Sequence, residues 1–392
     1  MMTSKWRSRS FIAHTIRTLA MFGVTALALS SSGPQVFAAV RDVYVSPEGA
    51  GAHDGRGPTD AMTLQQGLQL AERGSNAIRL ILAAGIYDVS ALGSVHLKTQ
   101  ADAPLTIEGA GPATVLVGGY GPGASRDVSL FLLSRGNVAF RNFVVRNVAR
   151  FIAVPNGGTP EGVVVSHVSI RDVYDGIVID RGKRHVVRDW RIEDLDLSGY
   201  VRVGIRLAGQ NTQRIAISRA VIDGGGARAA NDCYKAGIQL YEAVSDVTIE
   251  DVNVSNNVGC AEASYQQGDG IEADDKQGAP QRITLRRVVS TGNRDGAFDL
   301  KAKDMALEDL VADSAGVSRS GFRFWSYPYT CVRCRVAGEK SDFQLNNARL
   351  LLRDPPQADA PSYIRCNDRS ELPPSVYRVE IAGSSSGELV CR

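Results

Sequence analysis

Apolar and polar residues alternate in short segments spread along the chain. Examples are residues 137–142, 213–218, 246–250 and 281–286, all rich in β-branched side chains. A period of two places every second side chain on the same face, so each segment predicts a strand with one buried face.

A second kind of segment carries a glycine at a fixed place, as in Asp175–Asp180 (DGIVID) and Asp269–Asp274 (DGIEAD). Six such segments place glycine at positions 176, 204, 237, 270, 296 and 321, at intervals of 28, 33, 33, 26 and 25 residues. A drifting period in this range is typical of a solenoid whose loops vary in length.

Together the two kinds of segment predict repeats of two or three short strands, without a helix-length pattern. Stacked repeats would bury one apolar column and pair each strand with the coils above and below. We therefore expect an all-β protein, a single-stranded right-handed parallel β-helix. The alternatives fit less well, because a propeller blade needs about 40–50 residues and its own motif, and sandwich strands lack a glycine-marked register.

Both ends of such a stack need covering. Residues 63–73 predict a short amphipathic helix that caps the N-terminal end. Prolines mark residues 354–392 as a loop-rich C-terminal segment, with a last strand at 376–381. We find no interdomain linker and expect one domain over residues 39–392, working as a monomer.

Residues 1–38 are typical of a cleaved signal peptide. Four basic residues precede an apolar run from Leu19 to Leu29, and Val36-Phe37-Ala38 offers small residues for cleavage. The run is too short to span a bilayer. The sequence thus predicts an exported protein, periplasmic or secreted, with no membrane partner once the signal is removed.

Removal of residues 1–38 would change the formal net charge from +2 to −2, because this segment has four basic and no acidic residues. The balance argues against a nucleic-acid partner. The six cysteines favour disulfides in an exported chain. We expect the pairs Cys233–Cys260, Cys331–Cys334 and Cys366–Cys391; zinc or redox chemistry at Cys331-x-x-Cys334 is the alternative.

In the glycine segments, alternation places Ile177, Ile205, Ile238, Ile271 and Phe322 inward. The following residues would form an outward column of Val178, Arg206, Gln239, Glu272, Asp299 and Arg323, where Asp299 joins if Ala297 is a one-residue bulge. With neighbouring strands about 4.8 Å apart, charged side chains would crowd together. Asp269 and Asp295 would lie just before this column, and Asp274 and Lys301 just after it.

So many carboxylates on a small surface repel one another unless a cation neutralises them. Oxygen ligands without histidine favour Ca²⁺, so we expect a calcium site built from Asp269, Glu272, Asp295 and Asp299. The simpler interpretation is a set of solvated Asp-Gly turns. We adopt that interpretation for Asp175, which has the same dipeptide but no acidic neighbours.

Several motifs resemble known families. Residues 43–49 (VYVSPEG), 63–66 (TLQQ) and 80–87 (LILAAGIY) are similar to the start of pectate-lyase-like β-helix proteins. Residues 268–273 (GDGIEA), 293–299 (NRDGAFD) and 320–323 (SGFR) resemble the site of polysaccharide lyase family 9. The resemblance is loose over most of the chain and more specific over residues 265–325.

The resemblance implies Ca²⁺ bound through Asp269, Asp295 and Asp299, and a catalytic base at the position of Arg323. The chain departs from the family twice. The family's double aspartate is here Arg294-Asp295, and the family's basic lysine is here Arg323. These departures bear on metal binding and on the identity of the base.

The implied chemistry is β-elimination on a uronate, in which a cation stabilises the charge that develops when the C5 proton leaves. Arg323 would be the base, as arginine is in related β-helix lyases. Alternatively, Arg323 would clamp the substrate carboxylate while Lys301 acts as base. In a third interpretation Arg323 only forms a salt bridge with Asp299.

The expected partner is an acidic polysaccharide, with Arg206 and Lys276 as candidates for binding its carboxylates and Trp325 for stacking on a sugar ring. Three alternatives to a lyase stay open. One is a hydrolase of the polygalacturonase type, which needs two or three carboxylates. Another is a C5-epimerase, and the third a non-catalytic polysaccharide-binding or exopolysaccharide-processing protein.

Overall fold

The computed structural model describes residues 40–98, 103–121, 123–180, 184–226, 233–260, 267–313, 320–338, 342–356, 364–382 and 384–391. Residues Ala39–Arg392 form one compact unit. The predicted signal peptide, residues 1–38, lies outside the described residues and stays a prediction. Within the described residues, no helix has the length and apolar character needed to cross a membrane.

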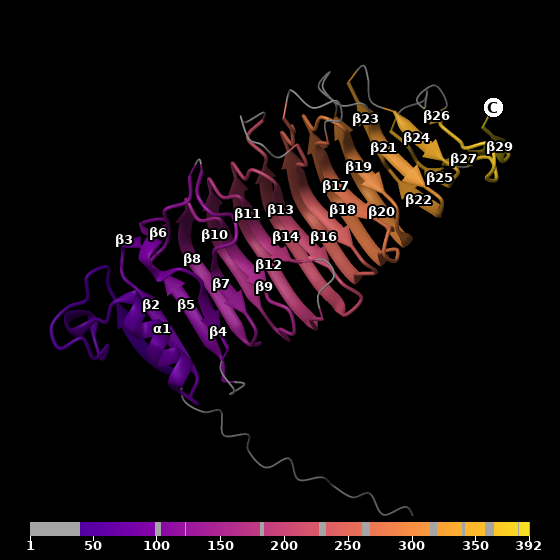
Figure 1. Cartoon of the computed structure of the whole chain (residues 1–392). Helices are drawn as coiled ribbons and strands as arrows, with labels where there is room; N and C mark the ends of the chain where they lie inside the picture. The colour runs from indigo at the N-terminus through magenta and orange to yellow at the C-terminus, as the bar shows by residue number, and fades with distance from the viewer. Residues whose placement is uncertain are drawn as a thin grey trace, which may run out of the picture. The chain divides into compact units, whose positions relative to one another are not determined.

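Strands of the described chain form two sheets, which the chain visits in turn as it advances from coil to coil (Figure 1). The 18-stranded sheet, here the long sheet, holds β1 (Arg41–Val45), β2 (Ile78–Leu82), β3 (Gly85–Asp88), β5 (Leu105–Gly109), β6 (Thr114–Val117), β8 (Val138–Arg146), β10 (Val164–Arg171), β12 (Val187–Ser198), β14 (Thr212–Asp223), β16 (Ser245–Ser255), β18 (Gln281–Thr291), β20 (Lys303–Asp313), β22 (Pro328–Val332), β23 (Arg335–Ala337), β25 (Arg349–Arg353), β27 (Val376–Ile381), β28 (Ser384–Ser385) and β29 (Leu389–Val390).

The 11-stranded sheet, here the site sheet, holds β4 (Val95–Leu97), β7 (Ser129–Leu133), β9 (Arg150–Val154), β11 (Asp175–Ile179), β13 (Val203–Ala208), β15 (Ala236–Tyr241), β17 (Asp269–Asp274), β19 (Gly296–Leu300), β21 (Ser320–Trp325), β24 (Phe343–Asn346) and β26 (Ile364–Cys366). Consecutive strands of this sheet pair in parallel, as β11 does with β13 and β13 with β15. The fold is therefore the predicted right-handed parallel β-helix.

The core lies between the sheets and is built by the inward positions that alternation predicts. Ile177, Ile205, Ile238 and Ile271 pair in register on successive coils, and each is fully buried. Farther along, the rings of Phe298, Phe322 and Phe343 stack with centroids 4.7 and 4.9 Å apart. Because burial of each such side chain contributes roughly 1.5–3 kcal/mol, this column fixes which residues of the site sheet face outward.

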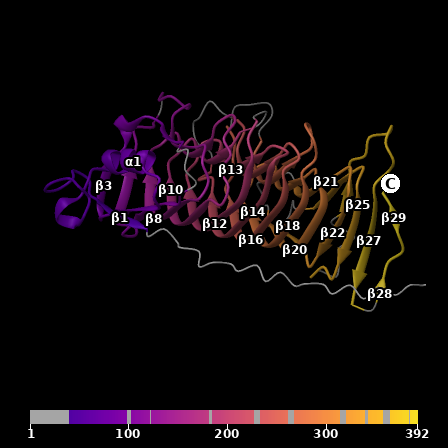
Figure 2. The same ribbon diagram turned by 90° about the horizontal axis from the view of Figure 1, so that it is seen from below.

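The end segments match their predictions. Helix α1 (Leu64–Arg73) follows the cap residue Thr63 and contacts β1 and β2 at the indigo end of the stack (Figure 2). Thr63 and Gln66 form a reciprocal capping box. Short 3₁₀ helices lie at Pro58–Asp60 and Ser90–Leu92. At the C-terminal end, β27 has the predicted bounds and pairs antiparallel with β28 and β29.

The disulfides Cys233–Cys260, Cys331–Cys334 and Cys366–Cys391 confirm the predicted pairing. Two sulfurs bonded to each other are not available as zinc ligands, so the zinc alternative at Cys331 and Cys334 is not supported, and the redox alternative stays a prediction. In the order given, the paired cysteines lie 27, 3 and 25 residues apart in the sequence.

The long sheet carries two exposed rows in which aspartate and arginine alternate from coil to coil. Every member has a positive φ between 50° and 57°, and such a left-handed bend is unusual for arginine. In the cross-coil pairs, the arginine guanidinium donates two hydrogen bonds to the aspartate of the preceding coil. We call these the charge rows: Asp189, Arg214, Asp246, Arg282 and Asp304 in one, and Asp194, Arg219, Asp251, Arg287, Asp309 and Arg333 in the other.

Candidate active site

The predicted outward column of the site sheet is present and in register. Val178 pairs with Arg206, Arg206 with Gln239, and Gln239 with Glu272 on successive coils. Glu272 then pairs with Asp299, and Asp299 with Arg323. The sequence pattern therefore placed the charged column on the correct strands and in the correct order.

The predicted bulge at Ala297 is wrong. Gly296 pairs with Ser320 and Phe298 with Phe322, so one residue stands between the paired positions on each strand. Gly296 therefore lies opposite Ser320, and Ala297 opposite Gly321. Asp299 reaches the column without a bulge. The segment that contains Asp295 is shifted by one residue relative to the alignment that would match its glycine with the glycines of the neighbouring segments.

The outward face is far less exposed than alternation suggests. Glu272 and Asp299 have exposed fractions of 4% and 5%, and Val178 has none. The strands β13, β15, β17 and β19 are buried at every position. A buried charge is costly unless it is paired, so the partners of these carboxylates define the site.

Arg323 is the cation on which the aspartates converge. Its Nη2 lies 2.7 Å from Oδ1 of Asp269, 3.1 Å from Oδ2 of Asp295 and 3.2 Å from Oδ2 of Asp299. The three aspartates come from different places on the strands, since Asp295 precedes β19 and Asp269 begins β17. Asp269 also accepts hydrogen bonds from the backbone N–H of Gly296 and the side-chain amide of Gln267.

This arrangement does not fit the calcium ion that the sequence predicts at these residues. Ca²⁺ needs six to eight oxygen ligands at about 2.3–2.6 Å, and the guanidinium of Arg323 stands where Asp269, Asp295 and Asp299 converge. Glu272 is bonded instead to the amide of Gln239. Among the described residues, no group of three or more His, Cys, Asp or Glu side chains is disposed to hold a metal ion. Calcium binding stays a prediction.

Lys301 and Trp325 hold the other side of Asp299. The Lys301 ammonium lies 2.9 Å from Oδ2 of Asp299, and the Trp325 indole N–H donates to Oδ1 at 2.6 Å. Nζ of Lys301 also lies 5.2 Å from the centre of the Trp325 ring, within cation–π range. Asp299 thus links the more deeply placed Arg323 to a lysine and an aromatic ring that are nearer the surface.

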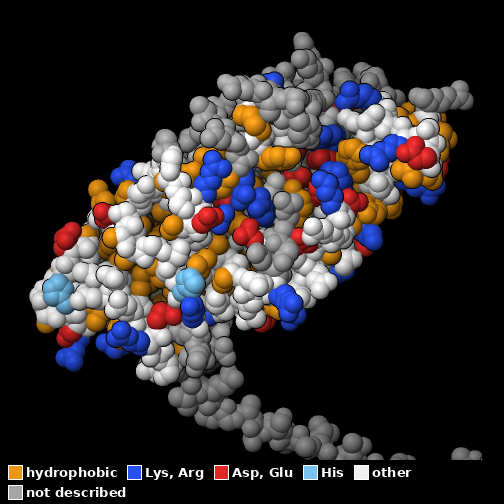
Figure 3. Space-filling model, viewed as in Figure 1, with side chains coloured by type: hydrophobic (Ala, Val, Ile, Leu, Met, Phe, Trp, Pro, Cys, Tyr) orange, Lys and Arg blue, Asp and Glu red, His pale blue; other side chains and the backbone are white. Residues whose placement is uncertain are grey.

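These surface residues border a polar cleft of about 680 Å³. Glu272, Asp299, Lys301 and Trp325 line one part, and Asn346, Asn367 and Arg369 line another. On the face seen in Figure 3, acidic and basic side chains gather over the strands of the site sheet. The cleft is wide enough for a sugar unit and offers charges of both signs.

Burial changes the acidity of this cluster. It raises the pKa of Asp269 well above its ordinary value, although Arg323 opposes the rise. Burial and the neighbouring Asp299 also raise the pKa of Glu272. Burial acts to lower the pKa of Lys301, but Asp299, Glu272 and Asp274 outweigh it and raise the pKa. Shifted groups beside a cleft are typical of a functional site.

The two basic residues predicted to bind substrate lie in different places. Lys276 lines the cleft with its side chain 83% exposed, 3.6 Å from Asp274. Arg206 is buried and donates to Gln239, whose amide donates to Glu272. Burial, followed by the nearby Arg202, lowers the pKa of Arg206. Arg206 therefore belongs to a hydrogen-bonded row that leads to the cleft rather than to the cleft surface.

Asp175 is a residue that the sequence interpretation missed. The expected solvated turn is wrong, because Asp175 is fully buried and bonded to Arg150 and Arg202. The signal was present in the sequence: Arg202 lies just before its glycine segment, and Arg150 is paired with Asp175 one coil earlier. The relevant arginines stand 25 and 27 residues away, at about one repeat, so only the coil register brings them to Asp175.

Comparisons with known proteins identify the fold class but no family. No family model matches the chain, and no curated protein matches it. Among solved structures, pectate lyase Pel9A is similar at 12% identity and a TM-score of 0.50, over 80% of this chain and 76% of that one. An alginate lyase from Paenibacillus sp. str. FPU-7 is similar at 11% identity and a TM-score of 0.49, over 87% of this chain and 99% of that one. A rhamnogalacturonan lyase gives 11% identity and a TM-score of 0.49, over 84% and 88%.

The protein thus shares its parallel β-helix fold with pectate lyase Pel9A. At these identities the likeness shows the fold alone.

Proposed function

We propose that this protein is an exported lyase, related to polysaccharide lyase family 9, that cleaves a uronate-containing polysaccharide by β-elimination. The observation that carries the proposal is the Lys301 ammonium, held by Asp299 beside Trp325 at the edge of the cleft. The similarity to a pectate lyase of the same fold supports it. The ammonium and carboxyl groups that proton transfer needs lie close together at this edge of the cleft.

In this proposal Lys301, as the neutral amine, removes the C5 proton of a uronate unit. The electron pair forms the C4–C5 double bond, and the sugar oxygen on C4 leaves. Glu272 lines the same cleft, and its raised pKa lets it hold a proton that it can give to the leaving oxygen. Trp325 offers an aromatic surface for the sugar ring.

Arg323 has a positioning role in this proposal. Its guanidinium stays charged and is shared among Asp269, Asp295 and Asp299. An arginine bound in this way is poorly placed to accept a proton, so the alternative in which Arg323 is the base is less well supported than Lys301. By fixing Asp299, Arg323 sets the place of the Lys301 ammonium.

The test is the ultraviolet absorbance of unsaturated uronate ends, measured with the mature protein on polygalacturonate, alginate and other acidic polysaccharides. We expect Lys301→Gln to lower kcat by roughly 10²–10⁴-fold, the usual contribution of a positioned base. Because the pKa of Lys301 is raised, the neutral amine becomes more abundant toward alkaline pH. Glu272 must keep its proton in the same step, so the wild-type kcat/KM should be bell-shaped: it rises with pH up to the pKa of Glu272, stays level up to the pKa of Lys301 and falls above it.

Lys98→Gln is the matched control, because Lys98 is an exposed lysine in the N-terminal part of the stack and should leave the rate unchanged. Equal rates for Lys301→Gln and the wild type would contradict the proposal. Parallel assays with calcium and with chelator address the predicted cofactor directly. A rate that disappears with chelator would show that a metal contributes despite the contacts of Arg323.

One observation favours a second candidate, a glycoside hydrolase. Glu272 and Asp299 are paired on neighbouring strands, whose backbones lie about 4.8 Å apart, a spacing compatible with the separation of about 5–5.5 Å between the carboxyl groups of retaining hydrolases. Glu272, with its raised pKa, would be the acid and Asp299 the nucleophile. New reducing ends without ultraviolet absorbance would identify this reaction.

A further inference from the structure

A second charged cluster lies on the site sheet, away from the cleft. At its centre is Asp175 at the start of β11, which has no exposed surface. Arg202 donates to both of its carboxylate oxygens, at 2.9 and 2.6 Å, and Arg150 donates to one at 3.2 Å. One carboxylate therefore holds two arginines in place.

A third arginine joins the cluster through Tyr174. The guanidinium carbons of Arg126 and Arg202 both lie 4.9 Å from the centre of the Tyr174 ring. Arg126 also approaches the tyrosine hydroxyl at 3.5 Å. Three arginines and one aspartate leave a net positive charge of two on this cluster, in contrast to the acidic excess beside the cleft. Such a charge favours an anionic ligand.

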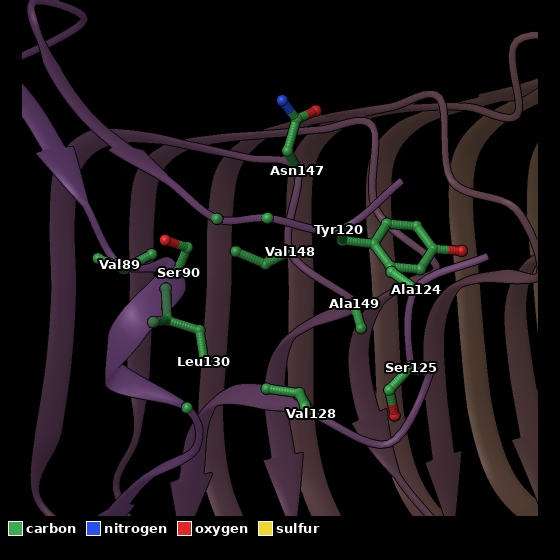
Figure 4. A pocket seen from close by; sticks show the side chains of 13 residues that line it. Val89, Ser90, Tyr120, Ala124, Ser125, Val128, Leu130, Asn147, Val148 and Ala149 are labelled. Atoms are coloured by element: carbon green, nitrogen blue, oxygen red, sulfur yellow. The ribbon is translucent and has the colours of Figure 1, made fainter. Parts of the chain in front are cut away.

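A cavity of about 190 Å³ (Figure 4) lies next to the cluster, although Arg126, Tyr174 and Arg202 are not among the residues that line it. Tyr120 lines the cavity and contacts Tyr174 edge to face, with ring centroids 6.3 Å apart. Ser125, next to Arg126 in the chain, and Asn147 add polar groups, and Val148 adds an apolar wall. An aromatic ring beside hydroxyl and amide groups suits a sugar, whose faces are apolar and whose edge is polar.

The coil register gives the distance between the two clusters. Asp175 pairs with Val203, Val203 with Ala236, and Ala236 with Asp269, so three coil steps separate the two aspartates, or about 15 Å. Lys and Arg side chains gather over the middle of this face (Figure 3). A ligand that reaches both places must be a polymer running along the sheet.

We propose that Arg126, Tyr174 and Arg202, with the adjoining cavity, form a subsite for an acidic sugar unit of a polysaccharide whose chain continues to the cleft. This subsite rests on the proposed substrate class but not on the reaction. Arg126 is the exposed member and binds the carboxylate of the sugar. Arg202, fixed by Asp175, supplies the second positive charge.

The test is the affinity of disaccharides and of long oligosaccharides prepared from polygalacturonate and alginate, measured by calorimetry in the Lys301→Gln background to prevent turnover. Arg126→Gln should weaken binding of the long oligosaccharides roughly tenfold or more, as loss of a charge-assisted hydrogen bond predicts. Disaccharides that fill only the cleft should bind as before. Arg126→Lys keeps the charge and should retain part of the affinity.

Arg171→Gln is the control, since Arg171 is an exposed arginine on the long sheet. Long oligosaccharides that bind equally well to Arg126→Gln and Arg171→Gln would overturn the subsite, even if the protein is a lyase. Absence of binding by every uronate oligosaccharide would overturn it too. Binding that depends on Arg126, together with no unsaturated product when the wild-type protein is given the same oligosaccharides, would keep the subsite and refute the lyase.

Discussion

Arginine and aspartate meet both in the charge rows and in the candidate site, with opposite results. In the charge rows of the long sheet, each bonded arginine faces one aspartate of the preceding coil, and both are partly exposed, as in Arg219 and Asp194 at 53% and 27%. In the candidate site, Arg323 is shared by three aspartates, and its side chain is only 12% exposed.

The acidity of the carboxyl groups records this difference. In the charge rows, the hydrogen bonds from arginine lower the pKa of Asp194 and Asp251. In the site, burial and the excess of carboxylates raise the pKa of Asp269 and Glu272. The exposed pairs therefore favour the charged carboxylate, whereas burial in the crowded site favours the protonated carboxyl group. Burial separates the charge rows from the candidate site, because Arg219, Arg287 and Arg333 of the charge rows also bond a second carboxylate, a glutamate.

The largest expected effect comes from removing the shared cation. Arg323→Ala leaves Asp269, Asp295 and Asp299 buried without it, and loss of one partner of a buried ion pair costs about 3–5 kcal/mol. Arg219→Ala, in an exposed pair, should have a much smaller effect that declines with added salt. Urea unfolding at neutral pH measures both. Similar losses in the two variants would contradict the distinction between the regions.

Adding calcium to Arg323→Ala should change the stability of the variant by less than the substitution itself does. With the guanidinium gone, the oxygens of Asp269, Asp295 and Asp299 become available to a metal. Calcium should therefore raise the stability of Arg323→Ala, by about 2.7 kcal/mol at a concentration one hundred times Kd. The wild type, whose own cation occupies this place, should respond less. The melting temperature with and without calcium measures the change, and an equal rise in both proteins would show that Arg323 does not exclude the metal.

The smallest effects concern pH, and the two regions should differ in sign. A carboxyl group whose pKa is higher in the folded than in the unfolded protein lowers the free energy of unfolding once the pH exceeds its pKa in the unfolded protein. The pKa of Glu272 is raised in this way, so Glu272→Gln should increase the free energy of unfolding at neutral pH. The pKa of Asp246 is lowered to about 2, so its contribution is present above about pH 4 and lost as pH falls toward 2. Asp246→Asn should therefore lower stability at neutral pH, by less than about 1 kcal/mol because the pair is exposed. Urea unfolding at several pH values tests both, and equal signs would refute the contrast.

The sequence predicted the repeating architecture well because local patterns determine it. Alternation identified the inward isoleucines and the outward column from Arg206 to Arg323, and the amphipathic pattern identified helix α1. The glycine match misplaced the alignment around Asp295 by one residue and introduced a bulge that the register does not have. Local similarity between Asp-Gly dipeptides does not reveal which residue of each pairs across coils.

The burial and the bonding partners of the site residues could not be predicted from the sequence pattern, for a different reason. Burial of Glu272 and Asp175 depends on residues from other coils, and alternation carries no information about them. The same holds for the convergence of three aspartates on Arg323, since these residues lie up to 54 positions apart. Coil register, once known, brings these residues together.

The alternation of sign along the charge rows has a consequence for how this chain can be assembled and altered. If β14 were to stack directly on β18, with β16 skipped, Arg214 would meet Arg282 and Arg219 would meet Arg287 instead of the aspartates of β16. Deleting or duplicating a single coil in this part of the chain would create the same clash, whereas a change of two coils would preserve the match. The charge rows therefore favour the native order of the coils over any order in which arginine faces arginine or aspartate faces aspartate.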